Sequence, residues 1–276
     1  LKVKGTFSFD RFSSGTVSRG KTPDYYVPAT GRDDEGNLII ASKSNGTNFL
    51  DYSKSGDYGN KSVYMEATLS YDRTFAEKHS VAAMLLFNRR NYDDGSKLPY
   101  RNQGLAGRAS YTYAGKYVGE FNFGYNGSEN FARGKRYGFF PSVSAGWRIN
   151  EEKFFAPLRK QISNLKLRFS LGALGNQQVG YYDYLQTISS GGTISYAFGD
   201  KNKASGASIS APNASDFTWE TVVTKNIGLD LGLLNNRLNM TADIYVRDTK
   251  DMLMASKDLP NVYGASSPKT NAANLR

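Results

Sequence analysis

The sequence contains no cysteine and a single histidine, His79. The absence of cysteine excludes disulfide bonds and thiolate metal sites. His79 lies in a predicted tight turn, with no nucleophile motif near it, so a serine hydrolase triad has no candidate base. The pattern therefore predicts no enzyme, no catalytic residue, no cofactor and no metal site.

Long apolar runs and charge clusters are also missing. No stretch of about 18 apolar residues occurs, which excludes a membrane-spanning helix. The net charge is +10, but the 35 Lys and Arg residues are scattered singly, without the basic run of a nucleic-acid-binding arm. The acidic pairs Asp33-Asp34 and Asp93-Asp94 lack the alternating ligand spacing of a calcium loop and are interpreted as solvated turns. We expect no nucleic acid among the partners.

What is present favours strands and turns. The chain has 19 Tyr, 16 Phe and 28 Gly residues in 276. In "NNRLNMTADIYVRD" (235–248) every second side chain from Leu238 to Val246 is apolar, and the intervening ones are polar. A period of two is typical of a β-strand whose two faces meet different surroundings.

Alternation and turn signals predict nine antiparallel strands. Most have 11 to 13 residues, which is long for a soluble domain but fits a tilted strand that crosses a bilayer. The ranges are 2–12, 61–73, 79–91, 103–114, 116–126, 137–149, 164–175, 217–233 and 237–248.

Long and short connections alternate along the chain. The segments 13–60 and 176–216 are long, whereas 74–78 and the "LLNNR" turn are short. Outer-membrane barrels have short periplasmic turns and extended external loops, whereas a Greek-key sandwich has no reason to alternate in this way. The segment "NEEKFFAPLRKQ" can hold a short helix, limited by Pro157.

Aromatic residues gather near the predicted strand ends. Rings at the two membrane interfaces would explain this, and the alternative is the general preference of Tyr and Phe for strands. The residues are Tyr71, Phe75, Tyr113, Tyr117, Phe139, Phe140, Trp147, Phe154 and Phe155.

Aromatic residues in the predicted loops are the candidate substrate-binding residues. Rings beside amide and charged donors suit a carbohydrate or a peptide, and the alternative is packing of one loop on another. They are Tyr25, Tyr26, Tyr52, Tyr58, Tyr181, Tyr182 and Tyr184, together with Phe49.

Several long stretches resemble the SusC/RagA-like TonB-dependent transporters of Bacteroidetes outer membranes. These stretches are "FNFGYNGSENFARGKR" followed by "YGFFPSVSAGWRINEEKFF", "LKLRFSLGALGNQQVGYYDY", "FTWETVVTKNIGLDLGLLNNRLNMTADIYVRDTKDMLM" and "LPNVYGASS". Earlier in the chain, "LSYDRTFAEKHSVAAML" and "GRASYTYAGKYVGEFNFGYNGS" are similar to barrel hairpins of that family. The resemblance covers nearly the whole chain in order.

The resemblance implies an all-β, up-and-down antiparallel barrel of 22 strands around a plug, in the bacterial outer membrane. Residues 1–276 would be a partial barrel domain without the plug and the N-terminal regions. The whole transporter would import glycans or peptides with a SusD-like surface lipoprotein, driven by the TonB–ExbB–ExbD complex. The motifs transfer no substrate-binding residue to this chain.

The alternation assigns polar side chains to an enclosed interior and apolar side chains to lipid. Arg108, Glu120, Asp230, Asp243 and Arg247 are predicted to face inward. A segment of this kind should have exposed edges and an exposed apolar band. The competing hypothesis is a non-transporting binding or adhesive module, a soluble β-sandwich or barrel whose apolar face is sealed in a core.

Overall fold

The structure is a computed structural model that describes residues 1–27, 31–95, 98–198, 202–210, 216–255, 260, 262 and 267–276. Nearly all of its regular elements are strands, and two short 3₁₀-helices lie between β8 (Tyr137–Arg148) and β9 (Ile162–Asn176). Among the described residues, no helix has the length and apolarity needed to cross a bilayer.

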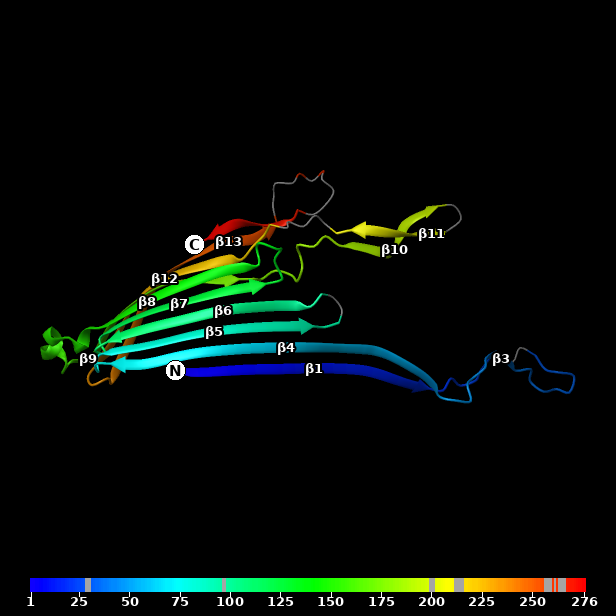
Figure 1. Ribbon diagram of the computed structural model, residues 1–276. Coiled ribbons are helices and arrows are strands. Elements are labelled where there is room, and N and C mark those ends of the chain that lie inside the picture. The colour runs from blue at the N-terminus through cyan, green and yellow to red at the C-terminus, as the bar shows by residue number, and fades with distance from the viewer. Residues whose placement is uncertain are drawn as a thin grey trace. The chain divides into compact units, whose positions relative to one another are not determined.

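Ten antiparallel strands form the main sheet (Figure 1). Each neighbour in space is also the next main-sheet strand in sequence, which is an up-and-down order. The order is β1 (Lys2–Gly20), β4 (Asp51–Phe75), β5 (His79–Asp93), β6 (Tyr100–Tyr113), β7 (Tyr117–Ser128), β8 (Tyr137–Arg148), β9 (Ile162–Asn176), β12 (Glu220–Leu233), β13 (Leu238–Ala255) and β14 (Lys269–Leu275).

All nine predicted strands are present, but several of their bounds were wrong. β1 continues to Gly20 and β4 begins at Asp51, although residues 13–60 were predicted to be a loop. Alternation does not mark these extensions, because a strand with both faces exposed needs no apolar side. In contrast, β12 begins only at Glu220, because Phe217 and Trp219 are buried in a cluster before the strand starts.

The prediction missed five strands. β14 lies in the predicted tail, and two hairpins lie within the predicted long loops. These are β2 (Tyr25–Val27) with β3 (Ala41–Ser44), and β10 (Ile188–Phe198) with β11 (Asn202–Ile209). Part of the "LPNVYGASS" motif lies outside the described residues.

The predicted short helix is two 3₁₀ turns, Ile149–Glu151 and Lys153–Leu158, with Pro157 inside the second. The other connections at the same end of the main sheet are tight turns, and residues in them adopt the left-handed backbone conformation. Leu234, Asn235 and Asn236 all have φ between 54° and 63°. Asn tolerates this region better than most residues do, and a run of two favours the turn.

The register places the alternating side chains of neighbouring strands on common faces. Ile244 of β13 pairs with Ile227 of β12, which pairs with Phe169 of β9, and Phe169 pairs with Ala145 of β8. We call the face that these residues share the apolar face. It is not covered by a second sheet among the described residues, because large side chains on it are exposed, Ile244 at 78%. The described residues therefore do not form a β-sandwich in which the apolar face is sealed in a core.

We call the opposite side of the sheet the polar face. Arg108, Glu120, Asp230, Asp243 and Arg247 all lie on it, since Asp230 pairs with Thr241, Gly228 with Asp243 and Thr224 with Arg247. The register thus places these five side chains on one face, and their predicted orientation toward an enclosed interior stays a prediction.

The described chain divides into two compact units. The larger unit comprises residues 1–8, 63–91 and 100–276, and it contains most of the sheet. The smaller unit comprises residues 9–62 and 92–99, and it includes the β2–β3 hairpin.

Candidate functional site on the polar face

The strongest polar constellation of the larger unit joins three strands. Arg168 of β9 donates to Asp230 of β12 through two bonds, Nε to Oδ2 at 2.9 Å and Nη2 to Oδ1 at 3.0 Å. The same Nη2 reaches Oδ2 of Asp243 on β13 at 3.2 Å. Paired, planar bonds of this kind are the strong form of an ion pair. The fold thus holds one guanidinium between two carboxylates.

Smaller neighbours complete this constellation. Asn226 donates to Asp243, and the Thr241 hydroxyl donates to Asp230. A Cβ at Gly228 would lie 2.5 Å from Oδ1 of Asp243 and 2.8 Å from Cζ of Arg168, so a side chain there would displace both of these groups. Gly228 therefore lets the guanidinium lie against the backbone of β12.

A second, simpler pair lies on β6 and β7. Arg108 bonds to Glu120 through Nε at 3.0 Å and Nη2 at 2.5 Å, and Asn122 donates to the other oxygen of Glu120. The Arg108 side chain is more than half exposed, whereas Arg168 is one-third exposed.

We expect Arg168→Ala to lower the free energy of unfolding by about 2 kcal/mol. Losing one partner of a buried ion pair costs about 3–5 kcal/mol, and partial exposure of these side chains reduces that cost. Urea titration of the full-length protein in detergent measures the change. The control is Arg108→Ala, which removes a more exposed guanidinium that pairs with a single carboxylate and should cost less than about 1 kcal/mol. Equal losses in the two variants would contradict this ranking.

An aromatic cluster closes the polar face where the long loops begin. Phe131 and Phe217 come from loops, Phe140 from β8, and Trp219 from the segment before β12. Their ring centroids lie 5.1 to 5.9 Å apart. The Trp219 indole also donates to the carbonyl of Arg136. The cluster fixes two loops that are far apart in sequence.

This cluster corrects part of the predicted aromatic belt. Phe140 is buried on the polar face, over Gly138 and Gly175, where a Cβ would collide with its ring. Phe155 is also buried. In contrast, Tyr113, Tyr117 and Trp147 stack in a row on the apolar face at the turn end.

Glu129 connects the aromatic cluster to the loop tyrosines. Its carboxylate pairs with Arg136 at 3.3 Å and with Arg101 at 3.8 Å, and it accepts a bond from the Tyr182 hydroxyl at 3.3 Å. Burial raises the pKa of Tyr182, and the negative charge of Glu129 raises it further. The phenol therefore keeps its proton at neutral pH and remains a donor to Glu129.

The predicted loop tyrosines fall into two separate groups. In the larger unit, Tyr184 packs on the aromatic cluster and its ring lies 6.1 Å from that of Tyr182. Tyr181 is more exposed, and its ring lies 3.7 Å from that of Tyr100. Loop packing thus accounts for Tyr182 and Tyr184, whereas Tyr181 and Tyr100 present an accessible pair of rings.

The other predicted tyrosines belong to the smaller unit, where Tyr25 and Tyr26 lie exposed on β2. Tyr52 carries the guanidinium of Arg19 over its ring, and Tyr58 contacts Phe12. Phe49 is exposed. These residues form no single site with Tyr181 that the structure defines.

At the turn end, Glu152 holds the short connections together. It accepts bonds from Lys116, Tyr117 and Trp147. The Tyr117 hydroxyl is the main cause that lowers the pKa of Glu152, and Lys116 lowers it further. His79 has an equally structural contact, since its Nδ1 lies 2.7 Å from the Tyr111 hydroxyl.

The sequence did not reveal the role of Glu129, Arg136 and Tyr100. Glu129 and Arg136 lie in the polar stretch "NGSENFARGKR". The only sign that this stretch matters was that it belongs to a long motif resembling the transporter family. Among the described residues, no group of three His, Asp or Glu side chains is placed to hold a metal ion.

Comparison with known proteins places these features in a family. A family model described as "TonB dependent receptor-like, beta-barrel" matches residues 2–276. TonB-dependent receptor P3 of Formosa agariphila is 29% identical over 295 residues, covering all of this chain and 28% of that protein. TonB-dependent receptor SusC of Bacteroides thetaiotaomicron is 36% identical over 155 residues, which is 55% of this chain and 15% of SusC.

Solved structures agree with this assignment. The RagAB peptide transporter matches 79% of this chain and 26% of its own, with 25% identity and a TM-score of 0.66. The RagAB peptide importer in its "closed-closed" state matches 99% of this chain and 30% of its own, at 22% identity and a TM-score of 0.70, which supports the fold alone. Where most of this chain is matched, it spans only about a quarter to a third of the length of the similar protein.

Proposed function

Because this chain belongs to the TonB dependent receptor-like β-barrel family, we propose that it forms part of the wall of an energy-coupled nutrient importer. The family is one of receptors and transporters, not of enzymes, and its members lie in the outer membrane of Gram-negative bacteria. The observation that carries the proposal is a sheet with two different faces. One face is apolar and exposed, and the opposite face is polar and contains ion pairs.

The polar face would line the interior of the closed barrel, and the apolar face would contact lipid. A closed barrel satisfies every strand hydrogen bond within the bilayer, whereas the ten strands described here leave β1 and β14 as edges. The remaining strands and a plug would come from the rest of such a transporter. Segment 1–276 would then be a partial barrel domain of the 22-stranded type.

The cargo would be glycans or peptides, delivered by a SusD-like surface lipoprotein. SusC is among the relatives of this chain, and RagAB, whose structure is similar, is a peptide importer. Import would draw on the TonB–ExbB–ExbD complex through parts of the transporter beyond this segment. The long connections at one end of the sheet would face outward and the tight turns would face the periplasm.

Within this scheme, the loop residue Tyr181 and Tyr100, the first residue of β6, are the described residues best placed to touch cargo. Their rings are in contact, and Tyr181 is about half exposed beside the polar cluster around Glu129. An aromatic surface beside charged donors suits a sugar face or a peptide side chain.

Uptake of labelled oligosaccharides and oligopeptides by cells that express the full-length protein tests the proposal. We expect TonB-dependent accumulation of one cargo class, and a roughly fivefold higher half-saturating concentration for Tyr181→Ala, from the loss of about 1 kcal/mol of ring contact. Phe139→Ala, on the apolar face, is the control and should leave uptake unchanged.

Two outcomes would count against the proposal. Binding of cargo at the cell surface without TonB-dependent accumulation would favour the non-transporting binding or adhesive module. A Tyr181→Ala variant with unchanged uptake would remove Tyr181 from the cargo path, while leaving the importer itself intact.

A further inference from the structure

The connection between β8 and β9 is longer than two neighbouring antiparallel strands need. It occupies residues 149–161 and contains both 3₁₀-helices, at the end of the sheet where the tight turns lie (Figure 1). The other turns at this end of the larger unit occupy only residues 76–78, 114–116 and 234–237. Because about two to five residues are enough to join such strands, the additional residues indicate a role beyond the connection itself.

This connection folds toward the apolar face. Glu152, which immediately precedes the second 3₁₀-helix, accepts bonds from the Tyr117 hydroxyl at 2.7 Å and from the Trp147 indole at 3.3 Å. Both rings belong to the stacked row on the apolar face. The Arg159 guanidinium donates to the Asn150 carbonyl at 2.7 Å, which ties the end of the second helix back to the first. The connection is therefore fixed beside the turn end of the apolar face.

The second 3₁₀-helix presents apolar side chains to its surroundings. Phe155 is buried, whereas Phe154 is 67% exposed and Leu158 is 49% exposed. Ala156 and Pro157 between them are exposed as well. Residues three apart lie on the same edge of a 3₁₀-helix, so Pro157 lies beside Phe154. These exposed residues extend the apolar face beyond the ends of its strands, so a partner that covers that face is expected to cover them too.

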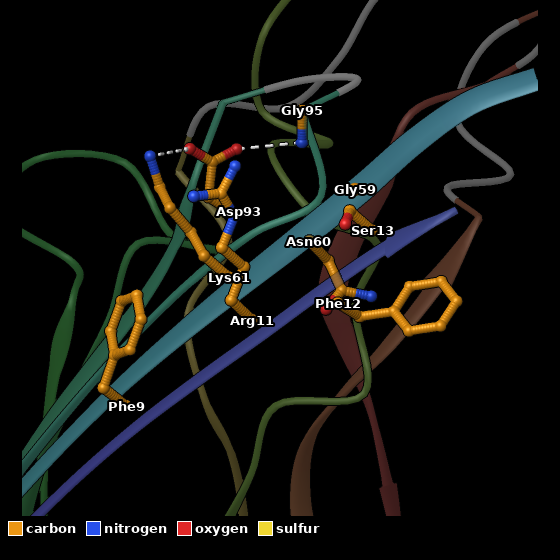
Figure 2. A pocket seen from close by; sticks show the side chains of 9 residues that line it. All are labelled: Phe9, Arg11, Phe12, Ser13, Gly59, Asn60, Lys61, Asp93 and Gly95. Atoms are coloured by element: carbon orange, nitrogen blue, oxygen red, sulfur yellow. Dashed lines mark hydrogen bonds and ion pairs between the residues drawn. The ribbon is translucent and has the colours of Figure 1, made fainter. Parts of the chain in front are cut away.

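Basic side chains flank these apolar residues. Lys153 precedes them and Lys160 follows them, and both are exposed. Among the residues that the structure describes, neither lysine forms an ion pair. Lys61 of the smaller unit is different, because its ammonium lies 3.1 Å from Asp93, whose other oxygen accepts a bond from the backbone N–H of Gly95 (Figure 2). The ammonium groups of Lys153 and Lys160 are therefore available to an anion.

We propose that residues 153–160, which we call the anchor segment, insert into the periplasmic leaflet of the outer membrane and bind anionic glycerophospholipids there. Phe154 and Leu158 would enter the boundary between headgroups and acyl chains. Lys153 and Lys160 would pair with lipid phosphates. Apolar residues between basic ones match a phospholipid surface in both polarity and charge. This inference rests on the proposed function, which places the apolar face in lipid and the tight turns at the periplasmic side.

A dye placed on the anchor segment tests the proposal in vesicles of phosphatidylethanolamine and phosphatidylglycerol. The full-length protein, without other cysteines, carries an environment-sensitive dye at Ala156→Cys, which leaves Phe154 and Leu158 intact. A nitroxide on the lipid, close to the headgroup, should quench this dye roughly threefold more than a dye at Asn239→Cys. Asn239 is the matched position, because it lies on the polar face at the same end of the sheet.

Serine at both large apolar positions should prevent the insertion. On the Ala156→Cys background, Phe154→Ser/Leu158→Ser should lower quenching by the lipid nitroxide to the level of the Asn239 dye and shift the emission of the dye toward its value in water. Heat-modifiable migration on gels checks that the variant is folded. If it is not, Phe154→Ser alone, which keeps Leu158, should still lower the quenching.

The two lysines should set the preference for anionic lipid. Lys153→Gln/Lys160→Gln should lower the preference for quenching by nitroxide-labelled phosphatidylglycerol over nitroxide-labelled phosphatidylcholine, by about fivefold for each lysine lost. The matched control is Arg148→Gln/Lys166→Gln, which removes the same charge from the polar face at the same end of the sheet. Its lipid preference should equal that of the unchanged protein.

A third dye, at Ile244→Cys on the apolar face, separates this inference from the proposed function. Lipid quenching at Ile244 but not at Ala156 would overturn the anchor segment and leave the assignment of the apolar face intact. Quenching of the Ala156 dye by aqueous iodide instead would favour a soluble periplasmic partner for this surface. Lipid quenching at neither position would overturn the lipid-facing assignment in the proposed function as well. Equal lipid preference in the two charge variants would overturn the binding of phosphate by Lys153 and Lys160.

Discussion

Phe131→Ala should lower the free energy of unfolding of the full-length protein by about 4 kcal/mol. Phe131 is completely buried, and it packs on Phe217 and Trp219 with ring centroids 5.9 and 5.1 Å away. The substitution leaves a cavity that the surrounding loops fill only in part, because Trp219 is held by its bond to the Arg136 carbonyl. Urea titration in detergent, extrapolated to zero denaturant, gives the value.

The control for this prediction is Phe139→Ala, which removes the same ring from a neighbouring part of the chain. Phe139 is 56% exposed on the apolar face, so its loss creates no enclosed cavity and should cost less than about 1.5 kcal/mol. Limited proteolysis gives a second measurement, since the loop 129–136 should be cut faster in Phe131→Ala. Equal destabilisation by the two substitutions would show that the aromatic cluster does not anchor the loops.

Ile244→Arg should destabilise the protein in lipid vesicles by about 3 kcal/mol. Ile244 is 78% exposed on the apolar face, in a row with Ile227 and Phe169. An arginine near the middle of the bilayer must leave water or bend toward an interface, and both cost free energy. Reversible urea unfolding from vesicles measures the difference.

Thr241→Arg is the matched control, since Thr241 lies on the polar face of the same strand. Its new guanidinium would lie beside Asp230, whose carboxylate already accepts a bond from Thr241. We expect a change of less than about 1 kcal/mol, because a charge on this face meets water and a carboxylate. If Thr241→Arg destabilised as much as Ile244→Arg, the assignment of the two faces would be wrong.

The faces of the strands could be predicted from the sequence because alternation is a local property. Ile244 and Asp243 are neighbours in the chain, and a strand sends neighbouring side chains to opposite sides whatever the rest of the fold does. The same reasoning failed for Phe217 and Trp219, which were assigned to a strand. Their burial depends on Phe131, more than 80 residues earlier, and no local pattern reports that contact.

The candidate site was predictable only in part. Loop composition predicted Tyr181, Tyr182 and Tyr184 as substrate-binding residues, and this stays a prediction. It gave no sign of the Glu129 carboxylate that bonds to Tyr182, or of the Tyr100 ring that contacts Tyr181. Nor did it separate these residues from Tyr25, Tyr26, Tyr52 and Tyr58, which belong to the other unit. Arg168 and Asp230 were each recognisable as polar, yet they are 62 residues apart and their pairing follows from the register of β9 with β12.

The sequence by itself determined that the chain forms long two-faced strands, joined by tight turns at one end and long loops at the other, because side-chain alternation and turn residues act over a few positions. Only the tertiary structure decided which charges meet, which aromatic rings are buried, and where loops form hairpins of their own. Those outcomes depend on strand register and on contacts between distant segments. The free energy of such contacts depends on residues far apart in sequence, so no local pattern reports it.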